Sequence, residues 1–208
     1  AAIHAHTRDE HRISLEGRLS CAAALELPVA HDILKELEAT VDRGSALEVV
    51  RVADRMLSLG LRFGTNRRRE VVGVSELLDR TDDPFARMSF LCLWGWCNVL
   101  SSRYQVALAI ADRALDDLTR YRVEVGSPYI RIVRAAALSG LGTHADALTE
   151  IDAALDVAEA MADIPGIQNG YALKARILVA SGDAYRACSL EPPDMDGAMR
   201  FVIGEVSG

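Results

Sequence analysis

Aromatic residues make up only 5% of this 208-residue sequence, and its only lysines are Lys35 and Lys174, against 21 arginines. The shortage of aromatic residues and of β-branched runs, beside abundant Ala and Leu, favours helices over sheets. We attribute the arginine excess to a genomic composition bias rather than to function. No apolar run approaches the roughly 20 residues needed to cross a bilayer, and no leader peptide opens the chain. We therefore expect a soluble, cytoplasmic protein without a membrane partner.

The sequence also lacks the residue spacings that are typical of metal sites and disulfides. Its four cysteines are Cys21, Cys92, Cys97 and Cys188. They form no CxxC pair, and we interpret them as buried reduced thiols. His4, His6 and His11 cluster near the start, where a frayed terminus explains them better than a metal site. We predict no metal and no cofactor, and the net charge of −7 argues against indiscriminate binding to nucleic acid.

What the sequence does contain is a repeat of forty residues between Pro84 and Leu190. Three columns of small residues share this period: Gly95, Ala135 and Ala175; Ala107, Ala147 and Ala187; Ala114 and Ala154. A turn recurs at one phase, at Ser102, Gly142 and Gly182. Such a period is typical of a solenoid, in which helix axes that approach to roughly 8–10 Å need small residues between them. Chance alignment in an irregular helical bundle is the alternative, and columns in shared phase disfavour it.

We predict an all-α fold, an α-α superhelix of helix pairs with a period of about 40 residues, as one domain over residues 1–208. Regular pairs are expected over 84–190, with helices at 85–101, 104–121, 129–139, 144–162, 167–180 and 183–189. Degenerate pairs are expected over 1–81, with helices at 8–27, 29–41, 45–59 and 66–79; Ser45 and Glu48 fit a capping box. After a linker at 191–194, residues 195–208 read as the start of a further repeat. Because the chain starts without Met and stops there, we expect a fragment of a longer protein.

Six arginines within nineteen residues form a local basic cluster in this acidic protein: Arg51, Arg55, Arg62, Arg67, Arg68 and Arg69. A solvated helix face is the ordinary interpretation of such a cluster. The alternative is a docking surface for an acidic partner or for phosphate groups, with Arg67, Arg68 and Arg69 as its candidate residues.

A small residue midway along the first helix, a glycine at the turn and an alanine opening the second helix together resemble a tetratricopeptide repeat. Residues 138–148 (LSGLGTHADAL) and 174–183 (KARILVASGD) resemble the sensor repeats of MalT-like, ATP-dependent large LuxR-type transcriptional regulators. This resemblance covers residues 86–208 well and the first eighty loosely. In that family an ATPase domain lies upstream and a helix-turn-helix domain downstream, but this sequence has no GxxxxGK[ST] motif and no basic recognition helix. The resemblance therefore implies only the sensing segment, without ATP hydrolysis or direct nucleic-acid contact.

In tetratricopeptide folds the first helix of each pair lines the concave face. By that register the candidate groove residues are Ser89, Trp96, Tyr129, Asn169 and Arg176. Trp96 would supply stacking area, Tyr129 and Asn169 hydrogen bonds, and Arg176 a charge clamp. For Trp96, packing between repeats and ligand contact both remain open.

Two functions remain open at this stage. The first is a non-catalytic sensing module of a LuxR-type regulator, which binds a small-molecule inducer or a regulatory protein or peptide. The second is a protein–protein interaction scaffold without a small ligand. An enzyme would need convergent titratable groups, whereas the acidic residues are scattered over outer helix faces: Asp112, Asp116, Asp117, Asp152 and Asp156. We therefore expect no enzymatic activity, and homo-oligomerisation stays open.

Overall fold

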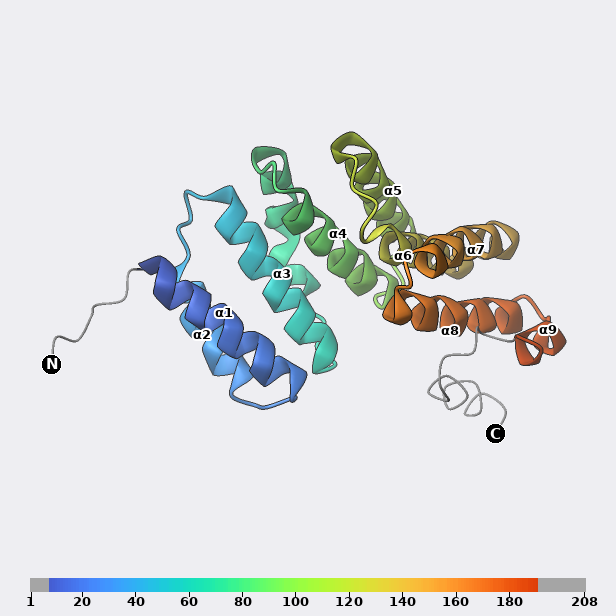
Figure 1. Cartoon of the computed structure of the whole chain (residues 1–208), viewed down its shortest axis with the longest axis horizontal. Coiled ribbons are helices and arrows are strands. Elements are labelled where there is room, and N and C mark those ends of the chain that lie inside the picture. Colours follow the sequence, from blue (N-terminus) through green and yellow to red (C-terminus); the bar gives the residue numbers. More distant parts are fainter. Residues whose placement is uncertain (1–7, 191–208) are drawn as a thin grey trace, which may run out of the picture. The chain divides into compact units, whose positions relative to one another are not determined.

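The structure is a computed structural model that describes residues 8–190. Within this range the chain forms nine α-helices and one 3₁₀-helix and contains no strand (Figure 1), which confirms the all-α prediction. The predicted linker at 191–194, the repeat start at 195–208, and His4 and His6 lie outside the described residues. The chain divides into two compact units, Ala1–Leu93 and Trp94–Gly208, which are described in turn.

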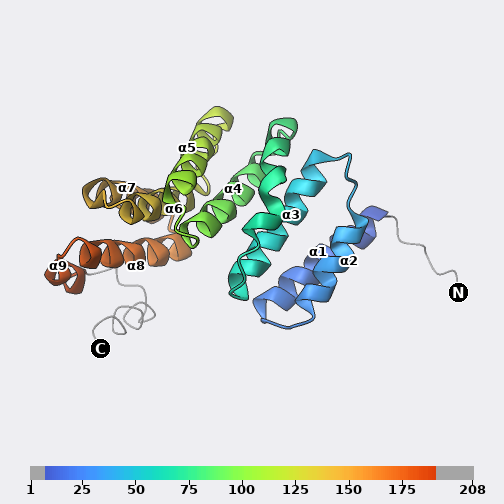
Figure 2. The same cartoon turned by 180° about the vertical axis from the view of Figure 1, so that it is seen from behind.

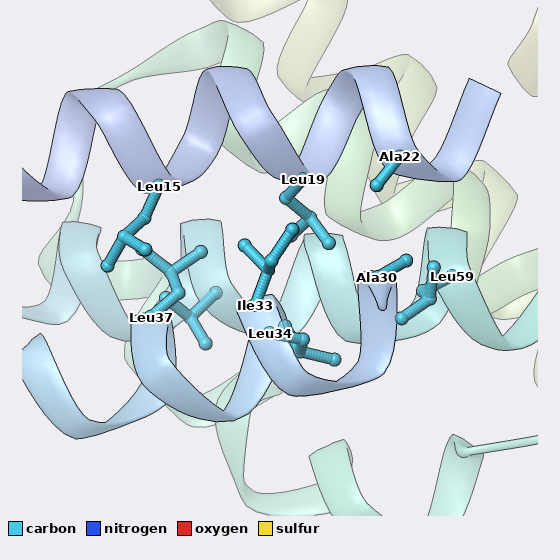
Figure 3. Close-up of a cluster of buried hydrophobic side chains, with 9 residues drawn as sticks. Leu15, Leu19, Ala22, Ala30, Ile33, Leu34, Leu37 and Leu59 are labelled. Carbon is cyan, nitrogen blue, oxygen red and sulfur yellow. The ribbon is translucent and has the colours of Figure 1, made fainter. Parts of the chain in front are cut away.

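The first unit is built on a three-helix core. Its elements are α1 (Arg8–Ala24), α2 (Ala30–Thr40), α3 (Ala46–Arg62), the 3₁₀-helix η1 (Arg68–Arg80) and the first turns of α4 (Pro84–Val99). Figure 3 shows Leu15 and Leu19 of α1 directed at Ile33 and Leu37 of α2, and all four side chains are buried. Leu59 of α3 is buried in the same apolar cluster. Burial of each such side chain stabilises the unit by roughly 1.5–3 kcal/mol, so the apolar stripes explain why these helices pack together.

The start of α3 confirms half of the predicted capping box. The Ser45 hydroxyl oxygen accepts a hydrogen bond from the Glu48 N–H at 3.4 Å. The Glu48 carboxylate accepts instead from the Asp42 N–H at 2.8 Å and from the Arg8 guanidinium at 2.6 Å. Glu48 therefore ties the turn before α3 to the start of α1, a contact that a local sequence motif does not predict.

The helix expected at 66–79 is present, and it forms as the 3₁₀-helix η1 rather than as an α-helix. The buried residues of η1 are Val71 and Leu78, and Val74 and Leu77 are half-buried. Gly73 and the valines beside it have low α-helix propensity. This composition disfavours a regular α-helix over these residues.

The second unit contains the regular repeats. After the end of α4 come α5 (Tyr104–Tyr121), α6 (Ser127–Gly140), α7 (His144–Ala160), α8 (Ile164–Ala180) and α9 (Ala184–Cys188). Each helix packs on the next, and α6 also packs on α8, so the first helices of consecutive repeats are neighbours (Figures 1 and 2). This is the arrangement predicted from the forty-residue period.

The predicted turn is a backbone motif that recurs three times. Ser102, Gly142 and Gly182 have φ values of 55°, 83° and 87°, all in the left-handed region. The next N–H in each repeat donates to the carbonyl five residues before it: Arg103 to Asn98 at 2.9 Å, Thr143 to Leu138 at 3.1 Å, and Asp183 to Leu178 at 2.8 Å. These bonds define the Schellman motif, whose left-handed residue is most often glycine. The turn prediction is confirmed at each of its three positions.

The small columns lie at buried contacts between helices. Ala107, Ala147 and Ala187 are buried, and so are Ala114 and Ala154. A Cβ atom placed on Gly95 in α4 would lie only 2.7 Å from Val133 Cγ1 in α6. The columns therefore mark contacts at which a larger side chain would force the helices apart.

Candidate functional site

The predicted groove residues fall in both units. Ser89 belongs to the first unit, and Trp96, Tyr129, Asn169 and Arg176 belong to the second. The Ser89 hydroxyl donates to Asp54 Oδ1 at 2.7 Å, so it lies beside a buried carboxylate of α3. The role of these residues in binding stays a prediction.

Trp96 and Tyr129 contact other residues of the second unit. Trp96 is half-buried against the apolar cluster that includes Ile132 of α6. The Tyr129 hydroxyl donates to Asp163 Oδ1 at 2.9 Å, and this oxygen also accepts the Gly166 N–H at 3.2 Å to cap α8. These contacts favour the packing role for Trp96, and they give the Tyr129 hydroxyl a partner within the chain.

Asn169 and Arg176 are exposed on α8 and lie seven residues apart. Two helical turns separate them, so both face the same side of the helix. Ala172 lies between them and is half-buried, and Val179 extends the same side by one turn and is exposed. We call Asn169, Ala172, Arg176 and Val179 the α8 strip. It offers an amide, a small residue, a cation and an apolar side chain in one row.

The arginine cluster is less basic in the structure than its sequence indicates. Arg51 Nη2 lies 3.0 Å from Asp83 Oδ2, Arg55 Nη1 lies 3.9 Å from Asp54 Oδ2, and Arg67 Nη1 lies 3.6 Å from Glu70 Oε2. Of the predicted docking residues, Arg67 and Arg68 are half-buried and Arg69 is exposed. Half of the cluster's charge is thus offset by carboxylates, which weakens its attraction for an acidic partner.

Ion pairs between repeats involve acidic residues on helix faces that look scattered in the sequence. Arg134 of α6 donates through Nε to Asp112 Oδ1 at 2.7 Å and through Nη1 to Glu150 Oε2 at 2.6 Å. Arg131 donates to the other oxygen of Glu150 at 2.7 Å. The hydrogen bond to Asp112, together with the charge of Glu150, raises the pKa of Arg134 against the effect of burial. This network links α5, α6 and α7.

The first unit contains a polar cavity of about 390 Å³. Its lining comes from α1, α3 and the start of α4: Glu16, Arg51, Asp54, Arg55, Asp83, Phe85, Ala86 and Ser89. Burial raises the pKa of Asp54, although the Ser89 hydrogen bond and the Arg55 charge act in the opposite direction. Burial, with a smaller effect of Asp54, raises the pKa of the neighbouring Cys92 thiol to about 12. Cys92 therefore stays protonated at neutral pH and is unsuited to act as a nucleophile.

A second, larger groove of about 700 Å³ lies in the second unit at the ends of α5 and α7. Apolar residues make up much of its lining, among them Leu115, Leu118, Val157 and Met161. Charged residues complete the lining, among them Arg122, Glu124, Arg131 and Asp156. In the part of the chain that the structure describes, no cluster of three or more His, Cys, Asp or Glu is placed to bind a metal. Within the same residues, no helix is both apolar enough and long enough to cross a bilayer.

No family profile matches this chain, and no curated protein matches its sequence. Among solved structures, a Rap protein complexed with competence and sporulation factor matches with a TM-score of 0.73 and 17% sequence identity. The match covers 88% of this chain and 53% of the Rap chain, so this chain spans about half the length of that protein. At this identity the likeness shows the fold alone. The chain therefore has the predicted tetratricopeptide-like helical-repeat fold.

Proposed function

We propose that this chain is a non-catalytic regulatory module that binds a polypeptide partner along the α8 strip. The observation that carries the proposal is the exposure of Asn169 and Arg176 on one side of α8. In the preceding repeat, the residues at the same two positions are Tyr129, which bonds Asp163, and Ala136, which is buried. The fold supports the proposal, because a structure of the same fold is a Rap protein in complex with competence and sporulation factor.

The composition of the strip suits a peptide. The buried side of α8, with Ile167, Ile177 and Leu178, already supplies its packing, so Arg176 is not needed for the core. Ala172 lets a peptide backbone approach the helix, while the Asn169 amide can both donate and accept hydrogen bonds. Arg176 can pair with a carboxylate of the partner in a bidentate manner. Arg176 is exposed, so its guanidinium is accessible to a partner.

Within this function we assign the module to the sensing segment of a cytoplasmic LuxR-type transcriptional regulator. The sequence of residues 138–148 and 174–183 supports this assignment, through its resemblance to the sensor repeats of that family. An interaction scaffold outside any transcription factor is the alternative, and the fold supports both equally. The two differ in what adjoins the module in a longer protein, whereas the chemistry of the α8 strip is common to both.

Selection from a random peptide display library against the immobilised chain tests the polypeptide partner. We expect enrichment of a consensus with at least one acidic residue, placed to pair with Arg176. A thermal-shift screen of metabolites run in parallel tests the small-molecule inducer. A metabolite that raises Tm while no peptide consensus emerges would contradict the polypeptide partner. Metal-dependent, nucleotide-saturable turnover by the purified chain would contradict the non-catalytic assignment.

A further inference from the structure

We propose that the polar cavity of the first unit binds one arginine side chain of the partner. That the partner is a polypeptide rests on the proposed function. That the bound side chain is an arginine rests on the cavity alone. Its volume of about 390 Å³ lies within the range of roughly 300–1,000 Å³ that is usual for ligand pockets. Neither the groove prediction nor the arginine-cluster prediction assigned a role to this cavity.

Of the three carboxylates in the lining, Asp54 has the weakest ion pair, because Arg55 lies 3.9 Å from it. Three carboxylates, Glu16, Asp54 and Asp83, face two guanidinium groups, Arg51 and Arg55. Arg51 is already paired with Asp83 at 3.0 Å. Arg12 lies 3.4 Å from Glu16, and with side chains 15% and 27% exposed this carboxylate is paired as well. One more positive charge in the cavity would therefore be attracted to the carboxylate that is least compensated, which is Asp54.

Asp54 has one oxygen engaged and one with spare capacity. The Asp54 side chain is 10% exposed, and its Oδ1 accepts the Ser89 hydroxyl at 2.7 Å. Its Oδ2 lies 3.9 Å from Arg55 Nη1, which is too long for a hydrogen bond. The Ser89 bond fixes the carboxylate, so a guanidinium entering the cavity would meet an oriented acceptor and lose little entropy in binding.

Phe85 selects arginine over lysine. Its side chain is 57% exposed although it is large and apolar, and it lines the same cavity. Its backbone N–H donates to Asp83 Oδ1 at 3.0 Å, which fixes its position at the first turn of α4. Ser89 follows four residues later and so lies on the same side of that helix. A flat guanidinium can stack on the exposed ring and reach the carboxylate, whereas an ammonium group cannot stack in that way.

The burial of Asp54 has an energetic cost that a bound cation would offset. A carboxylate removed from water is unfavourable unless it is paired and hydrogen-bonded. The direction of the Asp54 pKa agrees with incomplete compensation, since burial outweighs both Ser89 and Arg55. An asparagine would keep the Ser89 hydrogen bond without this cost. The carboxylate at this position therefore suits binding of a cation better than it suits packing.

Four capped amino acids test the proposal by NMR titration of the isotope-labelled full chain. The probes are the Nα-acetyl amides of arginine, lysine, citrulline and glutamate, and the readouts are the backbone amide signals of Ala86 and Ser89. We expect saturable shifts with the arginine probe, weaker binding of lysine and none of citrulline. Asp54→Asn should lower the affinity for the arginine probe by about tenfold or more, since a charged hydrogen-bonded pair is lost. Phe85→Ala should lower the affinity for the arginine probe severalfold, while the carboxylate of Asp54 stays in place.

Three results would overturn the proposal. The first is equal binding of the citrulline and arginine probes, and the second is the absence of any saturable shift. The third is preferential binding of the glutamate probe, which would place the recognition on Arg51 and Arg55. Lysine binding as tightly as arginine would overturn the role of Phe85 in selection. Unchanged amide signals elsewhere in Asp54→Asn show that the variant is folded. None of these probes tests the α8 strip, so a negative result with them does not contradict the proposed function. Likewise, a peptide that binds independently of Arg176 would contradict the α8 strip but not the arginine site in the cavity.

Discussion

Arg134 Nε lies 2.7 Å from Asp112 Oδ1, and forty residues later Lys174 Nζ lies 2.7 Å from Asp152 Oδ1. Each pair joins the first helix of one repeat to the second helix of the repeat before it. The two pairs occupy the same positions of the forty-residue period, so the stacking of the repeats is specified by charge as well as by small residues. Arg134 also bonds Glu150, which makes the first pair part of a larger network.

The network predicts unequal effects of removing two carboxylate charges from α7. Glu150 is 9% exposed and bonds Arg131 and Arg134, so Glu150→Gln removes the carboxylate charge that the two guanidinium groups share, and Arg134 keeps only Asp112. Because both arginines are about 30% exposed, water limits the loss, and we expect about 2 kcal/mol of unfolding free energy. Asp152→Asn, at a side chain 51% exposed, should cost less than about 1 kcal/mol. Equal midpoints for the two variants in urea unfolding would contradict this account.

Left-handed residues that are not glycine predict stabilising substitutions. Ser102 and Ala162 have φ values of 55° and 52°, a conformation that costs an L-residue roughly 1–2 kcal/mol. Ser102→Gly and Ala162→Gly should each raise the unfolding free energy by roughly 0.5–1 kcal/mol, after the entropy of glycine is deducted. Gly142→Ala is the matched control, because φ there is 83° and a Cβ atom would meet nothing within 4 Å. It should lower stability by a similar amount, and unchanged Tm values in this set would show that the turns are not strained.

Asp54 and Asp83 predict opposite effects of pH on stability. Burial raises the pKa of Asp54, so the folded chain holds its proton more tightly, and stability falls as pH rises from the ordinary aspartate value through the folded value. Asp83 has a lowered pKa, because hydrogen bonds from Ala86 and Arg51 together outweigh burial. Its stabilisation is present above the ordinary value and is lost as pH falls through the folded value. Asp54→Asn should therefore raise Tm at pH 7, and Asp83→Asn should lower it. A lower Tm of Asp54→Asn at pH 7 would contradict the assignment of an uncompensated charge.

The periodic features of the second unit could be predicted from the sequence, whereas its left-handed residues that are not glycine could not. The columns through Ala147 and the turns at Gly142 follow from side-chain size and backbone freedom, which repeat in phase. The left-handed residues Arg122 and Ala162 carry no such signal, because neither is glycine. The ion pairs at Asp112 and Asp152 do share the period, and a search for opposite charges twenty-two residues apart would have found them.

The first unit was harder to predict because it has no period. The Asp54–Ser89 bond joins residues thirty-five apart on different helices, and neither local propensity nor spacing indicates it. The same holds for Glu48, whose predicted local role is replaced by bonds to Asp42 and Arg8. Ser89 was predicted as a groove residue from its register alone. The cavity beside it depends on three elements meeting, which only the structure shows.

The most direct test of the proposed function is the affinity of a display-selected peptide for three forms of the chain at low and high salt. The forms are the native chain, Arg176→Ala, and the double variant Arg68→Ala/Arg69→Ala. Truncation of a central arginine in a binding site commonly costs about 2 kcal/mol, so Arg176→Ala should weaken binding roughly thirtyfold. The double variant should bind like the native chain, and the affinity should depend only weakly on salt. Normal binding by Arg176→Ala, together with strongly salt-dependent binding that only the double variant loses, would contradict the α8 strip as the partner site.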